Sequence, residues 1–171
     1  MSTSSPLPER FGPLMQVEIA TQLAIEHLLA RYVHALDDDC LEDWPGFFTE
    51  QGRYRITTLE NHRQGLPLCI VQADSRAMMR DRISALRHAN IYEAQSYRHT
   101  VSATLVRPLG DKGFEAISNF SVVRIMQDGA SVLFATGRYV DRISKAGNPL
   151  FEDKLVILDS RRIDTLLAIP I

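Results

Sequence analysis

Apolar residues recur every three or four positions near the start of the chain, which is the period of a helix with one buried face. The shared face would carry Ala20, Leu23, Ala24, Leu28, Tyr32 and Leu36, flanked by Val17, Ile25, Leu29 and Val33. This pattern predicts one long helix from about Met15 to Leu36, with an apolar stripe wide enough to lie against a sheet.

Two shorter helices are expected next. Asp39 lies three residues before Glu42, which is the spacing of a capping box, so a short helix is predicted through residues 41–48. Residues 74–89 repeat the helical period. The inward face of this later helix would be Met79, Ile83 and Leu86.

Most of the remaining chain has the composition of strands and turns. Strands are predicted over residues 52–59, 68–73, 97–108, 113–127, 131–144 and 150–159. Turns are expected at 60–67 and at the segments "GDKG", "QDGA" and "KAGNP". Helices first and hairpin-linked strands afterwards predict an α+β fold, with the helices on one face of a largely antiparallel sheet.

The chain length and the N-terminal composition indicate the number of domains and where the folded domain begins. A chain of 171 residues suits one domain. Residues 1–14 contain three prolines and a serine cluster, so they are predicted to form a flexible arm, with the domain covering residues 15–171.

Charge and hydropathy narrow the class of protein. A net charge of −2 gives no general attraction to nucleic acid or to an anionic membrane surface. No apolar run approaches the roughly 20 residues of a membrane span, and the N-terminus lacks the layout of a signal peptide. We therefore expect a cytoplasmic protein with no nucleic-acid or membrane partner.

Metal and nucleophile motifs are weak. His27 and His34 lie seven residues apart, and with Asp37 or Asp38 they could form a two-histidine, one-carboxylate iron site, although two histidines on the rim of a packed helix are the simpler interpretation. Two widely separated cysteines, Cys40 and Cys69, exclude a Rieske cluster in this chain. There is no GxSxG motif, and the glycines are scattered singly rather than grouped into a phosphate-binding loop.

Charged side chains cluster in two places. The acidic run Asp37, Asp38, Asp39, Glu42 and Asp43 is interpreted as capping and solvated carboxylates in preference to a catalytic pair. A basic stripe opposite the apolar face of the helix at 74–89 is expected to face solvent. It comprises Arg76, Arg80 and Arg87.

His99 is the best candidate for chemistry. It opens a predicted strand on which Val101, Ala103 and Leu105 would share its face. An inward histidine in a small cone-shaped fold can act as a general base. Tyr32, Asp37 and Tyr54 could line the same space. The other interpretation is a core histidine whose ring nitrogens are bound by a carbonyl or a hydroxyl.

Several segments together resemble the small (β) subunit of aromatic-ring-hydroxylating oxygenases. They are "WPGFFTEQGRYRIT", "LPLCIVQADSRAMMRDRISALRHANIYEAQSYRH", "VVRIMQDGASVLFATGRYVDRI" and "DSRRIDTLLAIPI". The likeness is greatest to the branch acting on aromatic carboxylates, such as the terephthalate, anthranilate and salicylate enzymes. It covers the chain from the first helix onward.

This resemblance implies a nuclear-transport-factor-2-like (cystatin-like) cone and a chain that is not itself catalytic. The Rieske [2Fe-2S] cluster and the mononuclear Fe(II) would belong to a catalytic α subunit, and no cofactor is expected in this chain. The implied assembly is an α3β3 hexamer that receives electrons from NAD(P)H through a reductase, with or without a ferredoxin.

Two expectations follow for individual residues. His99 should be buried and hydrogen-bonded, with no solvent-open cavity in front of it. Arg98, Arg138, Tyr139 and Arg142 lie in β segments where exposed arginine and tyrosine would suit a subunit interface. The alternative is a stand-alone dehydratase, isomerase or cyclase that uses His99 with Tyr32 or Asp37.

Overall fold

The structure is a computed structural model that describes residues 17–88, 94–145, 147–161, 167 and 169–171. The predicted N-terminal arm lies outside the described residues. The elements in chain order are α2 (Ile19–Asp37), η1 (Leu41–Phe47), β1 (Phe48–Thr58), α3 (Leu59–Arg63), β2 (Val71–Ala73), α4 (Arg76–His88), β3 (Gln95–Pro108), η2 (Gly110–Lys112), β4 (Phe114–Met126), β5 (Ser131–Ile143) and β6 (Phe151–Leu158).

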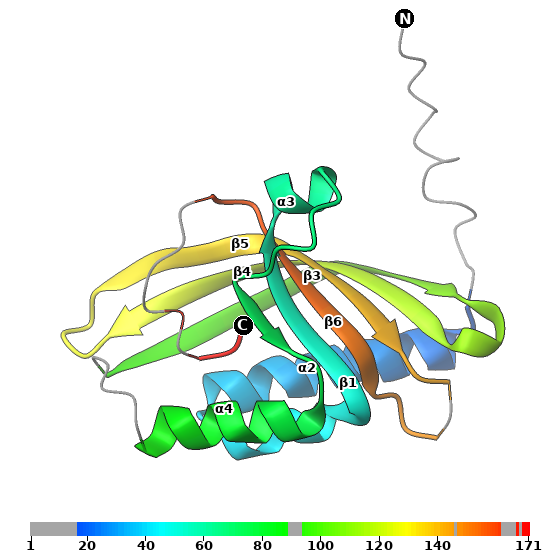
Figure 1. The fold of residues 1–171 in the computed structure, drawn as a ribbon, viewed down its shortest axis with the longest axis horizontal. Helices are drawn as coiled ribbons and strands as arrows, with labels where there is room; N and C mark the ends of the chain where they lie inside the picture. The colour runs from blue at the N-terminus through cyan, green and yellow to red at the C-terminus, as the bar shows by residue number, and fades with distance from the viewer. Residues whose placement is uncertain (1–16, 89–93, 146, 162–166, 168) are drawn as a thin grey trace, which may run out of the picture.

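The strands form one sheet in the order β2-β1-β6-β5-β4-β3. Strands β1 and β6 run parallel, and every other neighbouring pair is antiparallel. Figure 1 shows α2 and α4 on one side of this curved sheet, with the short α3 on the other. The predicted α+β cone with a mostly antiparallel sheet is therefore confirmed.

Helix α2 buries a narrower stripe than its sequence predicts. Its buried side chains are Ile25, Leu28, Leu29, Tyr32, Val33 and Leu36. Ala20, Leu23 and Ala24, which were expected on the inward face, are exposed, and Leu23 keeps 58% of its surface accessible. The helix lies along β3, and its contact with the core begins only at Ile25.

The predicted capping box at Asp39 is wrong. The residue preceding η1 is Cys40, and no side chain caps that helix. Asp39 instead ends α2 with a left-handed backbone (φ 56°). The amides of Asp39 and Cys40 donate to the carbonyls of Leu36 (3.3 Å) and Ala35 (2.8 Å), which is the Schellman pattern of a helix C-terminus. Aspartate tolerates this backbone conformation better than most residues because its short polar side chain can bond locally.

A β-bulge changes which residues of β3 face the core. His99 pairs with Val122 and Val101 with Phe120, but the register shifts between Ser102 and Leu105. Ala103 has φ 53° there. Beyond the bulge Val106 is buried and Leu105 is 53% exposed, so the predicted shared face of His99, Ala103 and Leu105 ends at Val101.

Smaller differences concern the second quarter of the chain. Residues Leu59–Arg63 form α3 where only a turn was expected, because the Thr58 hydroxyl accepts the amide of Asn61 as an N-cap. The following strand is limited to Val71–Ala73. None of the described helices is long and apolar enough to cross a membrane.

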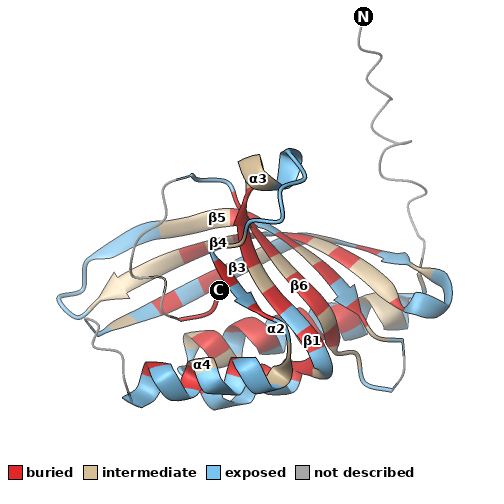
Figure 2. Ribbon diagram, in the orientation of Figure 1, coloured by how far each residue is buried: buried red, intermediate tan, exposed pale blue. Residues whose placement is uncertain are grey.

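Buried residues concentrate where α2, η1 and α4 meet the inner face of the sheet (Figure 2). The centre of this core is aromatic. Trp44, Phe48 and Tyr54 meet edge to face with ring centroids 5.0–6.3 Å apart. Tyr32 packs the same way on Phe151 at 5.5 Å. These rings tie the helical layer to β1 and β6.

Candidate functional site

Asp37 and His99 form a buried pair at the end of α2. The Nδ1 of His99 lies 2.6 Å from Oδ1 of Asp37, and the backbone amide of His99 donates to Oδ2 at 3.0 Å. The two side chains are 3% and 0% exposed, respectively. Arg98 Nη1 lies 3.7 Å from the same carboxylate. The pair therefore joins α2 to β3 inside the fold.

This geometry confirms a buried, hydrogen-bonded His99, although its partner is a carboxylate and not a carbonyl or hydroxyl. The Nε2 of His99 is also buried and meets no hydrogen-bond partner among the described residues. The structure thus brings together two of the three candidate catalytic residues. The expected absence of a solvent-open cavity stays a prediction.

Tyr32, the third candidate, is held elsewhere. Its hydroxyl donates to the main-chain oxygen of Ile171 at 3.1 Å. Tyr54 donates to the same oxygen at 2.9 Å. Burial raises the pKa of both phenols, so each keeps its proton as a hydrogen-bond donor at neutral pH.

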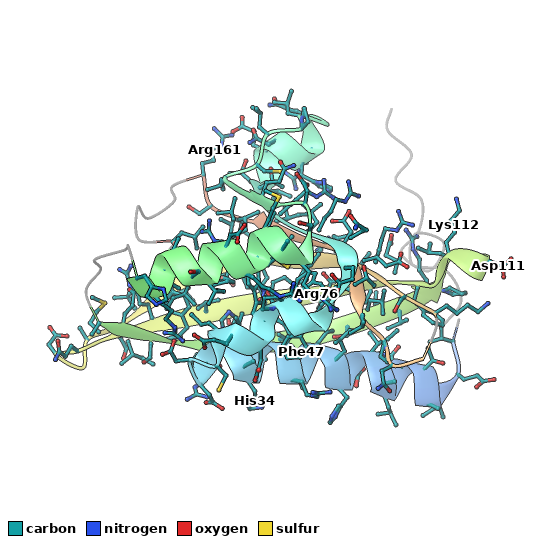
Figure 3. All side chains as sticks on the ribbon, turned by 60° about the horizontal axis from the view of Figure 1, so that its bottom comes forward. His34, Phe47, Arg76, Asp111, Lys112 and Arg161 are labelled. Carbon is teal, nitrogen blue, oxygen red and sulfur yellow. The ribbon has the colours of Figure 1, made fainter. Side chains whose placement is uncertain are left out.

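The hypothesis of an iron site on the first helix is not supported. His27 and His34 are exposed, and Figure 3 shows His34 pointing away from the body of the protein. Asp37 is engaged by His99 instead. In the described part of the chain, no group of three or more His, Cys, Asp or Glu side chains is arranged to hold a metal ion.

A buried ionic pair lies on the inner face of the sheet. Lys154 on β6 approaches Asp141 on β5 with Nζ 3.1 Å from Oδ2, and both side chains are fully buried. The ammonium also lies 3.6 Å from the ring centroid of Tyr139 and 4.6 Å from that of Tyr32. These cation–π contacts supply partners that water would provide at the surface.

Burial perturbs both groups of this pair. It raises the pKa of Asp141 to about 6, because the charged carboxylate is poorly solvated there, and the nearby Lys154 only partly offsets this effect. Burial likewise lowers the pKa of Lys154. This pair was not predicted from the sequence. The available signal was the period-two alternation of β6, which places Lys154 on the same face as Val156 and Leu158.

The basic stripe of α4 is only partly solvated. Arg87 forms ion pairs with Asp39 (2.9 Å) and Glu42 (2.8 Å), and it lowers the pKa of Glu42. Arg76, labelled in Figure 3, donates to the main-chain oxygen of Phe48 and forms an ion pair with Glu50. Arg80 and Arg87 are exposed as expected, whereas Arg76 is partly buried. Three members of the acidic run, Asp37, Asp39 and Glu42, therefore bind side chains of other elements. Asp38 and Asp43 are exposed, as expected of solvated carboxylates.

The sheet face opposite α2 and α4, here called the outer face, carries a row of alternating charge. The paired residues are Arg107, Glu115, Arg142, Asp153 and Arg53 on β3, β4, β5, β6 and β1. Arg107 pairs with Glu115, and Arg53 pairs with Asp153 at 2.7 Å. The next row is apolar and consists of Leu105, Ile117, Val140 and Leu155.

The predicted interface residues divide into two groups. Arg138 and Arg142 are exposed on the outer face and make no ion pair with any described residue, and Arg98 is also exposed. Tyr139 points inward and is fully buried, with its ring stacked on Phe120 at 4.3 Å. The expectation of an exposed Tyr139 was wrong, because strand alternation places it on the face opposite its two arginine neighbours.

Comparison with known proteins identifies the family. Residues 17–153 match the family model described as a SnoaL-like domain. The chain is 39% identical over 151 residues to the terephthalate 1,2-dioxygenase terminal oxygenase component subunit beta 1 of a Comamonas species, covering 88% of this chain and 98% of that protein. It is 40% identical over 155 residues to the anthranilate 1,2-dioxygenase small subunit of Burkholderia cepacia, covering 90% and 96%.

A solved structure agrees with these matches. It is a beta subunit, from Novosphingobium aromaticivorans, assigned to an aromatic-ring-hydroxylating dioxygenase. Its TM-score is 0.81 at 34% identity, and the match covers 90% of this chain and all of that one. The chain therefore belongs to the SnoaL-like family and, within it, to the small (beta) subunits of aromatic-ring-hydroxylating dioxygenases.

Proposed function

We propose that this chain is the non-catalytic small subunit of a Rieske-type oxygenase that hydroxylates an aromatic carboxylate. Its role would be to hold catalytic large subunits in a ring, as an α3β3 hexamer in the cytoplasm. The observation that carries this proposal is the 39–40% identity to small subunits over nearly the full length of both partners.

The chemistry of the proposed complex belongs to the large subunit. A Rieske [2Fe-2S] cluster and a mononuclear Fe(II) there would activate oxygen, with electrons from NAD(P)H passing through a reductase and, in some systems, a ferredoxin. The small subunit would contribute a rigid body. Two buried contacts favour this role: the Asp37–His99 hydrogen bond joins α2 to β3, and the Asp141–Lys154 pair joins the adjacent strands β5 and β6.

The outer face is the surface that best suits contact with other subunits. Its exposed Arg138 and Arg142 flank the apolar row of Leu105, Ile117, Val140 and Leu155. Arginine beside apolar side chains is typical of interface composition, and copies arranged around a ring must use heterologous contacts. Arg98 remains a candidate contact at the edge strand.

The test is to purify the small chain, the large chain and the co-expressed pair, and to measure iron content and turnover of terephthalate and anthranilate in each. We expect iron only in samples that contain the large chain, and no turnover by the small chain alone. Turnover by the small chain alone would refute the proposal.

The alternative is a stand-alone dehydratase, isomerase or cyclase that uses His99. The specific observation in its favour is the Asp37–His99 pair, which resembles a base and its orienting carboxylate. Tyr32 does not complete such a site, because its hydroxyl is bound to Ile171. The comparisons with small subunits do not favour this alternative.

A further inference from the structure

The end of the described chain lies inside the fold. Ile169 is 6% exposed and Ile171 is fully buried. Figure 1 shows the C-terminal end between the sheet and the layer formed by α2 and α4. The side chain of Ile171 therefore occupies the interior of the cone and not its surface.

The polar groups of Ile171 are bound by side chains and not by a strand or helix. Tyr32 on α2 and Tyr54 on β1 both donate to its main-chain oxygen, at 3.1 and 2.9 Å. The Tyr54 hydroxyl also accepts the amide of Ile171 at 3.0 Å. Two phenols from separate elements thus converge on a single acyl oxygen.

The surroundings of these phenols resemble a small-ligand site. Trp44 packs edge to face on Tyr54, and Phe47 and Phe151 pack on Tyr32. The ammonium of Lys154 lies 4.6 Å from the ring centroid of Tyr32. Apolar walls with a few convergent hydrogen-bond donors are the usual construction of a pocket for a small organic molecule.

We propose that Tyr32 and Tyr54 form an acyl-oxygen binding site that the chain occupies with its own segment Ile169–Ile171. The site takes a ligand with a branched apolar group next to a carboxylate or carbonyl oxygen. Such a ligand binds only when the segment is displaced, because the tethered segment competes at a high effective concentration.

The experiment uses the full chain with its segment released by the substitutions Ile169→Asp and Ile171→Asp, which place two charges where none can be solvated. The probe is the peptide acetyl-Ile-Pro-Ile, as free acid and as carboxamide, titrated while NMR shifts and Tm are recorded. We expect saturable binding to the released variant and none to the wild type. Binding of either form supports the proposal, and the tighter form identifies the preferred oxygen.

Adding Tyr32→Phe and Tyr54→Phe should weaken probe binding at least about tenfold, because both hydrogen bonds to the acyl oxygen are lost. If the double-aspartate chain does not fold, Ile171→Ala serves instead, since it shortens the occupying side chain without adding a charge. The proposal is overturned if the probe fails to bind whichever variant folds. It is also overturned if the tyrosine substitutions leave the affinity unchanged.

Discussion

At the scale of single residues, we expect the free energy of unfolding to depend most strongly on the buried Lys154–Asp141 pair. Lys154→Met would leave the Asp141 carboxylate buried without its partner. We expect a loss of about 3–5 kcal/mol in the free energy of unfolding, measured by urea denaturation. The double variant Lys154→Met/Asp141→Leu should recover most of the loss, and Lys112→Met, at an exposed lysine, should change little. A neutral Lys154→Met result would show that the pair is not buried as described.

The same pair predicts a dependence of stability on pH. Burial raises the pKa of Asp141 from 3.8 to about 6. Below about pH 4 the Asp141 carboxyl is protonated in both states, and its tighter proton binding in the folded state stabilises the protein. As pH rises from about 4 to about 6, the carboxyl of the unfolded chain ionises before that of the folded chain, so this stabilisation is lost. Relative to Lys154→Met/Asp141→Leu, the free energy of unfolding of the wild type should fall by up to about 3 kcal/mol between pH 4 and pH 6. Chemical denaturation of both proteins at several pH values measures this difference in the free energy of unfolding. A wild type that becomes more stable relative to the double variant between about pH 4 and pH 6 would contradict the prediction.

A substitution at Asp37 distinguishes a structural role of the Asp37–His99 pair from a catalytic one. Asp37→Ala removes the acceptor of two buried groups of His99, its amide and its ring nitrogen. We expect a loss of roughly 3 kcal/mol in stability, with the turnover of assembled oxygenase per iron unchanged. His34→Ala, on the exposed side of the same helix, is the matched control. A large fall in turnover per iron with little change in stability would instead favour the catalytic alternative.

At the scale of elements, one glycine controls how closely β5 approaches β6. A Cβ atom at Gly137 would collide with the main-chain oxygen of Ile157 and would lie 2.9 Å from the ring of Phe120. We therefore expect Gly137→Ala to reduce the free energy of unfolding by about 2–4 kcal/mol, because backbone must move to make room. Gly46→Ala, where nothing lies within 4 Å, should be nearly neutral. Equal Tm values for the two variants would contradict the described register.

Periodicity predicted most elements but not the points where the backbone departs from regular geometry. The strand boundaries from β3 onward agree closely with the sequence pattern, because alternation and turn residues are local signals. The bulge at Ala103 and the left-handed Asp39 were missed, since neither position is glycine. Each of these changed a prediction about neighbouring residues: Leu105 faces outward, and Asp39 ends α2 instead of capping η1.

At the scale of the whole molecule, the candidate site was predicted only in part. His99 and Asp37 could be named from the sequence, since a polar residue on an apolar face is visible there. Their direct contact and the insertion of Ile171 depend on how distant segments meet, which no local pattern encodes. The inward direction of Lys154, in contrast, follows from the alternation along β6. The family could be identified because its likeness spans nearly the whole chain, whereas the contacts between subunits depend on a partner sequence.

Whether this chain holds catalytic subunits together can be measured by native mass spectrometry of the complex. The large subunit would be expressed alone, with the wild-type small chain, and with the small chain carrying Arg138→Glu and Arg142→Glu on its outer face. We expect an assembly with equal numbers of both chains, three of each, that the charge-reversed chain forms poorly. A large subunit that reaches the same oligomeric state and iron content without the small chain, or that never binds it, would show that the small chain does not hold the catalytic subunits together.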